Sequence, residues 1–330
     1  MFHQVTLQEL SKTVVDGSDA CSLFGAPRWL VLWKQLGATP LYFDFSDTSS
    51  NAKSSTGIWF SASRLGSAHL SRIQAHLDGL PGLLLTPESR ASATQERSVS
   101  NDLRDMALDA LRRSAGLYAH WVDYYHQFSS EELPDGWCAQ EIVTQRITLG
   151  EREGAMRDSV KRSVKRHIAS GKRSGAMVRI AATEHDALAT YNLAEKTHER
   201  HGRARGYPIE MYYDLLRLSQ EDDRIIWYVC EHDGRIIGAH IALHECDTAL
   251  SWAPYMDRAF AELKPAYVLM DAVISAARER GAVYVNLGAT PAGAPGVERF
   301  KAGFGAEPYR YNVFIYRSLL AKALGKGALS

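Results

Sequence analysis

Hydrophobic positions in the second half of the chain change repeatedly between the two-residue period of strands and the three- to four-residue period of helices. Asp233-Gly234 joins two strand-like runs and predicts a tight hairpin. Pro208 stands near the start of one helical run, and Gly281 follows the end of another. The pattern predicts strands over residues 177–182, 224–231, 236–244, 248–255, 283–287 and 309–317, and helices over residues 186–202, 209–218, 266–279 and 297–303.

The first half predicts a less regular mixture of helices and strands. Leu103, Met106, Leu108 and Leu111 form the apolar face of an amphipathic helix. The predicted helices cover residues 29–36, 67–77 and 102–115, and the predicted strands cover residues 39–45, 57–62, 83–86 and 137–149. Both halves therefore belong to the α/β class.

A change in composition near Gly150 predicts a domain boundary, which gives an N-terminal domain over residues 1–150 and a C-terminal domain over residues 151–330. Residues 157–173 contain seven basic residues and one acid, and apolar residues recur there every four positions from Met156 to Ile168. This pattern predicts a helix with one apolar stripe and cations around it. Two interpretations remain open: a solvated basic face, or a strip that follows RNA phosphates.

Composition narrows the class of protein further. With 330 residues the chain is long enough for two domains, and 38 basic residues balance 38 acidic ones. The four cysteines lie far apart without a CxxC pair, which excludes the usual zinc signatures and a disulfide framework. The N-terminus lacks a signal pattern, and the best apolar run, residues 266–277, contains Asp271 and is too short for a bilayer. A cytoplasmic location without integral membrane association is expected.

Two segments carry a family resemblance. Val-Tyr-Val-Asn-Leu-Gly-Ala at residues 283–289 and Gly-Val-Glu-Arg-Phe-Lys-Ala-Gly-Phe-Gly at residues 296–305 resemble the C-terminal signature of the FemAB-like branch of GNAT acyltransferases. Residues 157–175 are similar to the cationic helix and glycine that open the family's second domain. The resemblance implies two tandem GNAT-like domains with mixed, mainly antiparallel sheets. The family's best-known members form amides by adding amino acids from aminoacyl-tRNA to peptidoglycan precursors.

The resemblance also suggests catalytic residues. Lys301 matches the family's functionally important lysine, and its ammonium group could neutralise a phosphate or the developing negative charge of the transition state. A solvated surface lysine is the alternative. Tyr255 ends the strand that borders the substrate cleft in the family's fold, and it could position the acceptor or pass a proton. The alternative is an aromatic side chain that only fills space at the end of the strand. Arg299 could bind donor phosphate or pair with Glu298.

The resemblance also implies acceptor-binding residues, because in GNAT folds the loop that follows the first long helix of the domain borders the acceptor side. His198 and Arg200 stand at the end of a predicted helix, where they either complement the helix dipole or recognise an anionic substrate. Trp252 is expected to share the face of Tyr255 and to form a wall of the cleft. Pro254 in this strand suits either a bulge or a strand end. The spacing of the histidines at His120 and His126 does not indicate a metal, and none is predicted.

The identity of the acyl donor is the main open question. CoA-dependent enzymes of this fold usually carry a glycine-rich pyrophosphate loop, but residues 261–267 contain no glycine. The leading hypothesis is therefore transfer from aminoacyl-tRNA to the amine of an envelope or secondary-metabolite precursor, without a cofactor. Its donor site would comprise Arg299, Lys161, Arg162, Lys165 and Arg166. The alternatives are an acyltransferase with acyl-CoA as co-substrate and a non-catalytic double-GNAT binding protein.

Overall fold

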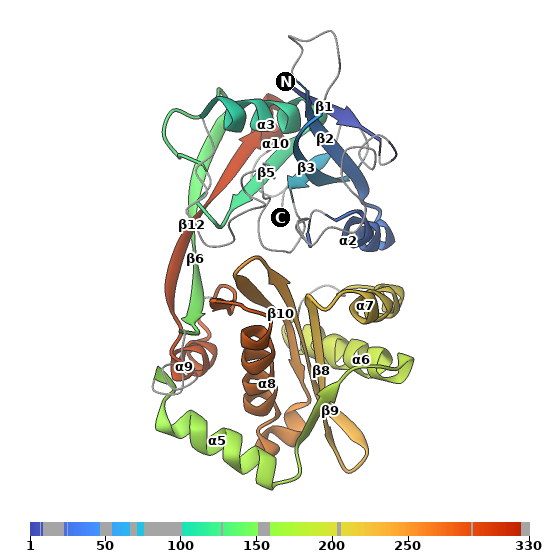
Figure 1. Cartoon of the computed structure of the whole chain (residues 1–330), viewed down its shortest axis with the longest axis vertical. Coiled ribbons are helices and arrows are strands. Elements are labelled where there is room, and N and C mark those ends of the chain that lie inside the picture. The colour runs from blue at the N-terminus through green and yellow to red at the C-terminus, as the bar shows by residue number, and fades with distance from the viewer. Residues whose placement is uncertain are drawn as a thin grey trace. The chain divides into compact units, whose positions relative to one another are not determined.

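The structure is a computed structural model that describes residues 1–6, 8, 23–24, 26–46, 55–66, 71–75, 101–126, 128–150, 159–202, 206–291 and 293–324. Two compact units make up the chain (Figure 1). The first comprises Met1–Ile142 with Arg310–Ser330, and the second comprises Val143–Tyr309. This division differs from the cut expected at Gly150, because the last strand of the chain pairs with a strand of the first unit.

The first unit is a sheet with helices packed on it. Its strands follow the order β1-β2-β3-β4-β5-β12, antiparallel except for the parallel pair β4–β5. The strands are β1 (Phe2–Val5), β2 (Thr39–Ser46), β3 (Ser55–Leu65), β4 (Arg72–Ala75), β5 (Tyr118–Asp123) and β12 (Glu307–Arg317). The helices are α2 (Pro27–Leu32), η1 (Trp33–Leu36), α3 (Asn101–Ser114) and α10 (Leu319–Leu324). The apolar face of α3 packs with Phe43, Phe60 and Trp121 in the core.

One predicted helix of the first unit is wrong. Within residues 67–77 the structure has strand β4, where Ile73 is fully buried between two half-buried polar neighbours. Pairing with β3 on one side and β5 on the other imposes this two-residue alternation, which overrides the local helical pattern. The strand predicted at residues 83–86 lies outside the described residues.

The second unit confirms the predicted order of elements. Its strands run β6-β11-β10-β9-β8-β7, with bounds β6 (Trp137–Thr148), β7 (Met177–Ile180), β8 (Ile225–His232), β9 (Arg235–Glu245), β10 (Thr248–Met256) and β11 (Tyr284–Asn286). The part of β6 before Val143 belongs to the first unit. The helices are α5 (Arg162–Arg173), α6 (Glu184–Arg200), α7 (Ile209–Glu221), η3 (Arg258–Leu263), α8 (Pro265–Glu279) and α9 (Pro295–Gly303). Asp233 and Gly234 form the hairpin with φ of 48° and 72°, as a tight turn requires. Residues 151–158, which include Met156 of the predicted stripe, lie outside the described residues.

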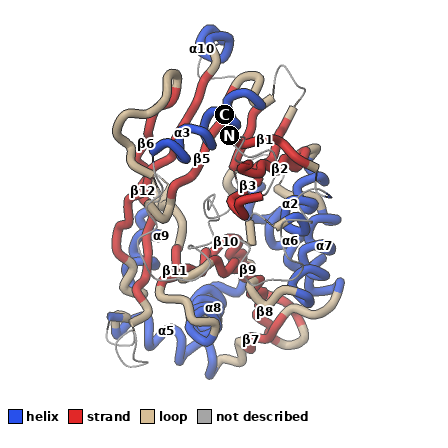
Figure 2. The backbone as a smooth tube through the Cα atoms, turned by 45° about the horizontal axis from the view of Figure 1, so that its top comes forward, coloured by secondary structure: helices blue, strands red, loops and turns tan. Residues whose placement is uncertain are grey.

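The two faces of this sheet carry different helices. Leu250, Ala253 and Tyr255 of β10 pair with alternate residues of β9, so they share one face. Ser251 and Pro254 share the other face. Figures 1 and 2 show α8 on one side of β8–β10 and α6 with α7 on the other. The Tyr212 hydroxyl of α7 reaches Tyr255, so the Tyr255 face is the one covered by α6 and α7.

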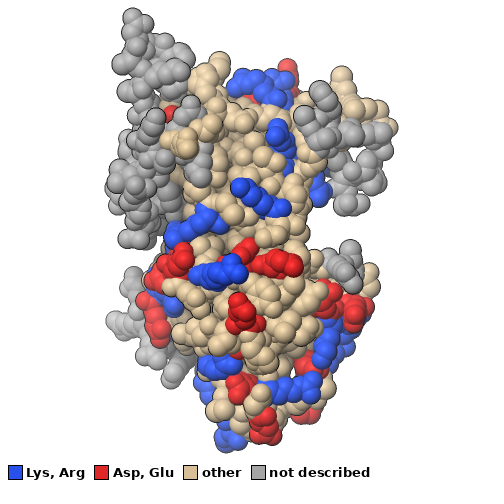
Figure 3. Space-filling model, turned by 90° about the vertical axis from the view of Figure 1, so that its right-hand side faces the viewer, with Lys and Arg blue, Asp and Glu red and all other residues tan. Residues whose placement is uncertain are grey.

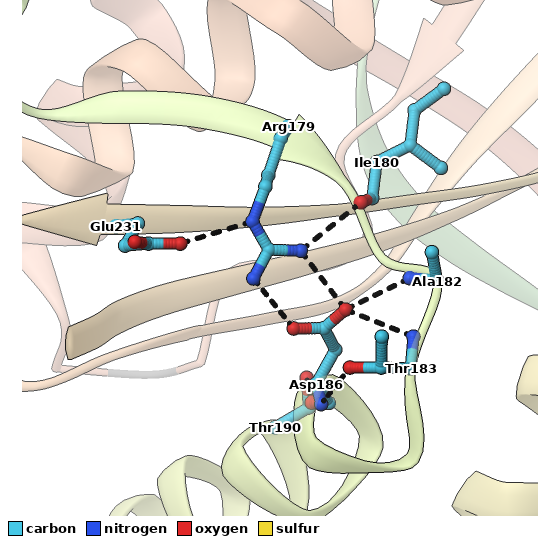
Figure 4. A network of polar contacts seen from close by, with 7 residues as sticks. All are labelled: Arg179, Ile180, Ala182, Thr183, Asp186, Thr190 and Glu231. Atoms are coloured by element: carbon cyan, nitrogen blue, oxygen red, sulfur yellow. Dashed lines mark hydrogen bonds and ion pairs between the residues drawn. The ribbon is translucent and has the colours of Figure 1, made fainter. Parts of the chain in front are cut away.

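A polar network holds the start of α6 on β7 (Figure 4). Arg179 donates to both carboxylate oxygens of buried Asp186, at 2.9 and 2.8 Å, and to Glu231 at 3.0 Å. Thr183 and Asp186 form a capping box at the first turn. Burial alone would raise the pKa of Asp186, but the hydrogen bonds from Arg179 and from two backbone N–H groups outweigh it and hold the pKa well below its usual range. Arg179 and Asp186 therefore stabilise the packing of α6 against β7.

Candidate functional site

β10 and β11 separate at the centre of the second unit. They pair in parallel only from Thr248 to Leu250 on β10, and β10 then continues to Met256 without β11. The register of β10 against β9 shifts between Ser251 and Ala253, which makes Trp252 the extra residue of a β-bulge. Pro254 itself stays in register with His240. Of the two alternatives for this segment, a bulge or a strand end, the structure has the bulge, two residues before the proline and next to the fork between β10 and β11.

An aromatic cluster lies at the end of β10, beside α7. The Tyr212 and Tyr255 hydroxyls lie 3.5 Å apart, and the rings of Tyr207 and Trp252 stack with centroids 5.4 Å apart. Burial, followed by the neighbouring Tyr255, raises the pKa of Tyr212 well above its usual range, so its hydroxyl keeps its proton. Trp252 lies three positions before Tyr255, a spacing that puts two residues of a regular strand on opposite faces, and the bulge lets Trp252 join this cluster all the same. The structure therefore brings Trp252 and Tyr255 together with two tyrosines that the sequence did not single out.

Lys301 is buried rather than solvated. Its exposed fraction is 6%, and its Nζ donates to the carbonyls of Gly288 at 2.7 Å and Ala289 at 3.0 Å. The interpretation of Lys301 as a solvated surface lysine is therefore wrong. Burial lowers the pKa of Lys301 to about 8. The Asn286 side-chain oxygen accepts from the Thr144 hydroxyl at 2.6 Å and from the Gly288 N–H at 2.9 Å, so two side chains fix the segment that follows β11.

The remaining acceptor candidates lie at the end of α6. His198 approaches Gly206 so closely that a Cβ there would lie 2.7 Å from the His198 Nε2. Arg200 is exposed, and partial burial together with the charge of Arg258 lowers its pKa. Figure 3 shows acidic and basic side chains interspersed over the face of the second unit that carries α6 and α7. The described part of this face is therefore mixed in charge, and His198 and Arg200 remain predictions as acceptor contacts.

The helix α5 carries exposed cations, as the sequence predicts, and its buried stripe packs against α8 and α9. The buried stripe includes Val164 and Gly171, and the Lys161 N–H donates to the Gly303 carbonyl at 2.9 Å. A Cβ at Gly171 would lie 2.9 Å from the Leu263 carbonyl oxygen, so α5 packs closely there. The exposed residues without an ion pair to any residue in the described ranges include Lys161, Arg162, Lys165 and Arg166. Arg299 on α9 is also exposed, and it forms no ion pair with Glu298.

The connection between β10 and α8 uses its backbone N–H groups internally. The Asp257 carboxylate accepts from the Ala259 N–H at 3.0 Å. Lys264 has a left-handed backbone with φ of 58°, and its carbonyl accepts from the N–H groups of Tyr267 and Val268 at 3.0 and 3.3 Å. No glycine occurs between Asp257 and Lys264. The Val268 bond is the ordinary first bond of α8, and the bonds of Ala259 and Tyr267 occupy donors near the place where a pyrophosphate would bind.

One buried polar pair near the fork escaped the sequence analysis. The His240 Nε2 lies 2.8 Å from the Ser251 hydroxyl, on the α8 face of the sheet. Burial lowers the pKa of His240 to about 4, so the imidazole is neutral near pH 7. Only the register of β9 against β10 brings these two residues together, since they are 11 positions apart in the sequence.

Comparison with known proteins defines the class. Residues 158–310 match the family model described as an acetyltransferase (GNAT) domain. This match covers the fork, the bulge, the aromatic cluster and Lys301. Residues 158–310 therefore form a GNAT domain, and the protein is an acyltransferase.

Within that class, the whole chain has the tandem fold of FemX. The crystal structure of FemX is 11% identical, with a TM-score of 0.68 over 98% of each chain. L-PGS from Bacillus licheniformis is 12% identical, with a TM-score of 0.52 over 97% of this chain and 95% of that one. None of the curated proteins compared with the sequence matches it. The resemblance to FemAB-like proteins and the prediction of two GNAT-like domains in mixed, mainly antiparallel sheets are confirmed. Across the described residues, no helix has the length and apolarity needed to span a membrane.

Proposed function

We propose that this acyltransferase moves an aminoacyl group from aminoacyl-tRNA to the amine of a small-molecule or envelope precursor. The acceptor nitrogen forms a bond to the ester carbonyl carbon, the bond to the tRNA ribose oxygen breaks, and the proton lost by the amine ends on that oxygen. The donor ester is already activated, so the reaction needs no cofactor. Lys301 is the proposed charge-stabilising group, and Tyr255 is the proposed contact to the amine.

The observation that carries this proposal is the internally bonded connection between β10 and α8. Asp257 and the Lys264 carbonyl take up N–H groups at the place where a glycine loop would bind a CoA pyrophosphate. The FemAB-like resemblance suggests aminoacyl-tRNA as the donor. Such a donor does not need a glycine loop with free N–H groups, because an RNA is bound through many phosphates spread over a larger surface.

The charge distribution on α5 supports an RNA donor. Lys161 and Arg162 stand at the start of this helix, where the macrodipole disfavours cations, and its first turn contains no acid. A cation that opposes the dipole and forms no ion pair with described residues does not stabilise the helix. Such a placement favours a role in binding an anionic partner.

A salt titration of tRNA binding tests the donor. Each phosphate contact contributes about −0.7 to −0.9 to the slope of log affinity against log salt. Replacing Lys161, Arg162, Lys165 and Arg166 by glutamine should weaken tRNA binding and flatten the slope. The double variant Arg112→Gln and Arg113→Gln, which removes two exposed cations of α3 that pair with Asp109, is the control for loss of positive charge outside α5.

Product analysis by mass spectrometry completes this test. The protein is incubated with a candidate amine and either charged tRNA or acetyl-CoA, and aminoacylated product is expected only with the tRNA. An unchanged affinity and slope in the quadruple variant would remove α5 from the donor site. Efficient turnover with acetyl-CoA would instead favour the CoA-dependent alternative, and turnover with neither donor would favour a binding protein.

A further inference from the structure

Arg146 of β6 is held between two aromatic rings. Its guanidinium carbon lies 3.7 Å from the ring centroid of Tyr284 and 3.8 Å from that of Tyr309. The side chain is half-buried, and it forms no hydrogen bond or ion pair with any other residue that the structure describes. Two rings that cover the faces of a guanidinium leave its edge, with the N–H donors, unused.

Other arginines of the chain show what a purely structural role requires. Buried Arg104 donates to the carbonyls of Ser129, Glu131 and Glu132 and to the Asp105 carboxylate. Arg179 likewise donates hydrogen bonds to the carboxylates of Asp186 and Glu231, as described above. Arg146 differs, because its orientation is fixed while its donors stay available. Fixing a planar fork in advance reduces the entropy lost when it binds a carboxylate or a phosphate.

The register places Arg146 opposite the last residue of β11, where β10 and β11 separate. Leu250 of β10 pairs with Asn286 of β11, and Asn286 pairs with Arg146, so the three side chains share one face. This is the face of Tyr255. Asn286 also holds the Gly288 N–H, and the Gly288 carbonyl is a Lys301 acceptor. Arg146 therefore stands on the Tyr255 face, with β11 between it and β10, and close to the segment that Lys301 fixes.

We propose that Arg146 binds an oxyanion, either a carboxylate or a phosphate, of the amine acceptor, with Tyr284 and Tyr309 orienting its guanidinium. The term acceptor rests on the proposed function, whereas the oxyanion site itself does not. In this arrangement the amine reaches the fork with its anionic group anchored on β6, so the acceptor is an amine that carries a second, negatively charged group.

Side-chain NMR of the full-length protein tests this site directly. The Arg146 Nε–H resonance is assigned by its loss in Arg146→Lys, and it is then followed during titrations with sodium phosphate and with sodium acetate. We expect the resonance to shift in these titrations, and the anion that shifts it at the lower concentration identifies phosphate or carboxylate as the preferred group. The Arg217 resonance is the internal control, because this exposed arginine of α7 already pairs with Asp214.

The ring contacts give a second test. Tyr284→Phe keeps the ring and should leave the anion affinity unchanged, whereas Tyr284→Leu removes it and should weaken binding about tenfold. An Arg146 resonance that moves with neither anion, or moves only together with that of Arg217, would overturn the assignment. The readout is binding rather than turnover. Failure of aminoacyl transfer with an intact Arg146 response would therefore refute the proposed function and leave this site standing.

Discussion

At the scale of single residues, Lys301 carries the most specific catalytic prediction. Its ammonium group is already fixed on two carbonyls of the segment after β11. Loss of one preorganised charge contact costs about 3 kcal/mol in the barrier, so Lys301→Ala should lower turnover about a hundredfold. With a pKa of about 8, the charged form declines as pH rises through 8, and wild-type activity should decline with it.

Steady-state kinetics at several pH values check this expectation, with a thermal melt to show that the variant is folded. Exposed Lys34 of the first unit, changed to alanine, is the control. Near-wild-type turnover in folded Lys301→Ala would show that Lys301 only holds the segment after β11 and takes no part in catalysis.

His240 gives a prediction for stability against pH. Its pKa is about 4 in the folded protein and 6.5 when unperturbed, so the unfolded chain binds the extra proton first as the pH falls. The protein should lose stability between pH 6.5 and 4, by about 3 kcal/mol for this group. The free energy of unfolding, measured with denaturant across this pH range, should change less with pH for His240→Gln than for wild type. Exposed His185→Gln should follow the wild-type curve, and a wild-type slope in His240→Gln would show that other groups dominate.

At the scale of elements, the docking of α5 on α8 depends on a glycine. A Cβ at Gly171 would meet the Leu263 carbonyl oxygen and a Val268 methyl group, each at 2.9 Å. Because a backbone oxygen cannot move aside without shifting η3, Gly171→Ala should destabilise the protein by about 2 kcal/mol despite the better helix propensity of alanine. Gly296 of α9 has open space around it, so Gly296→Ala should cost nothing. Chemical denaturation of the two variants measures the difference, and equal stabilities would refute the close packing.

At the scale of the whole molecule, the path of the chain limits where it can be divided. Cutting at residue 150 takes β6 from its partner β11 and separates β12 from its partner β5. The fragment 151–330 should therefore expose Phe314 and Ile315, which are buried in the intact chain, and aggregate or lose activity. The fragment 143–309 corresponds to one compact unit and should be the more soluble of the two. Expression and light scattering of both fragments test this, and a soluble, fully active 151–330 would contradict it.

The sequence by itself determined the local elements of the second unit. The hairpin at Asp233-Gly234, the helix before Gly281 and the meander from residue 224 to 255 are set by backbone preferences and apolar periodicity, which act over a few residues. The signature around Lys301 likewise located α9 and the segment before it. The helix predicted at residues 67–77 failed because pairing with strands distant in the sequence decided that segment.

Only the tertiary structure decided how the site is assembled. The burial of Lys301 on two carbonyls, the His240–Ser251 pair and the placement of Arg146 between Tyr284 and Tyr309 join residues from different elements. The bulge at Trp252 and the return of β12 to the first unit depend in the same way on strand register. Local periodicity shows which face a residue takes within its own element, but long-range strand pairing determines which residues meet it.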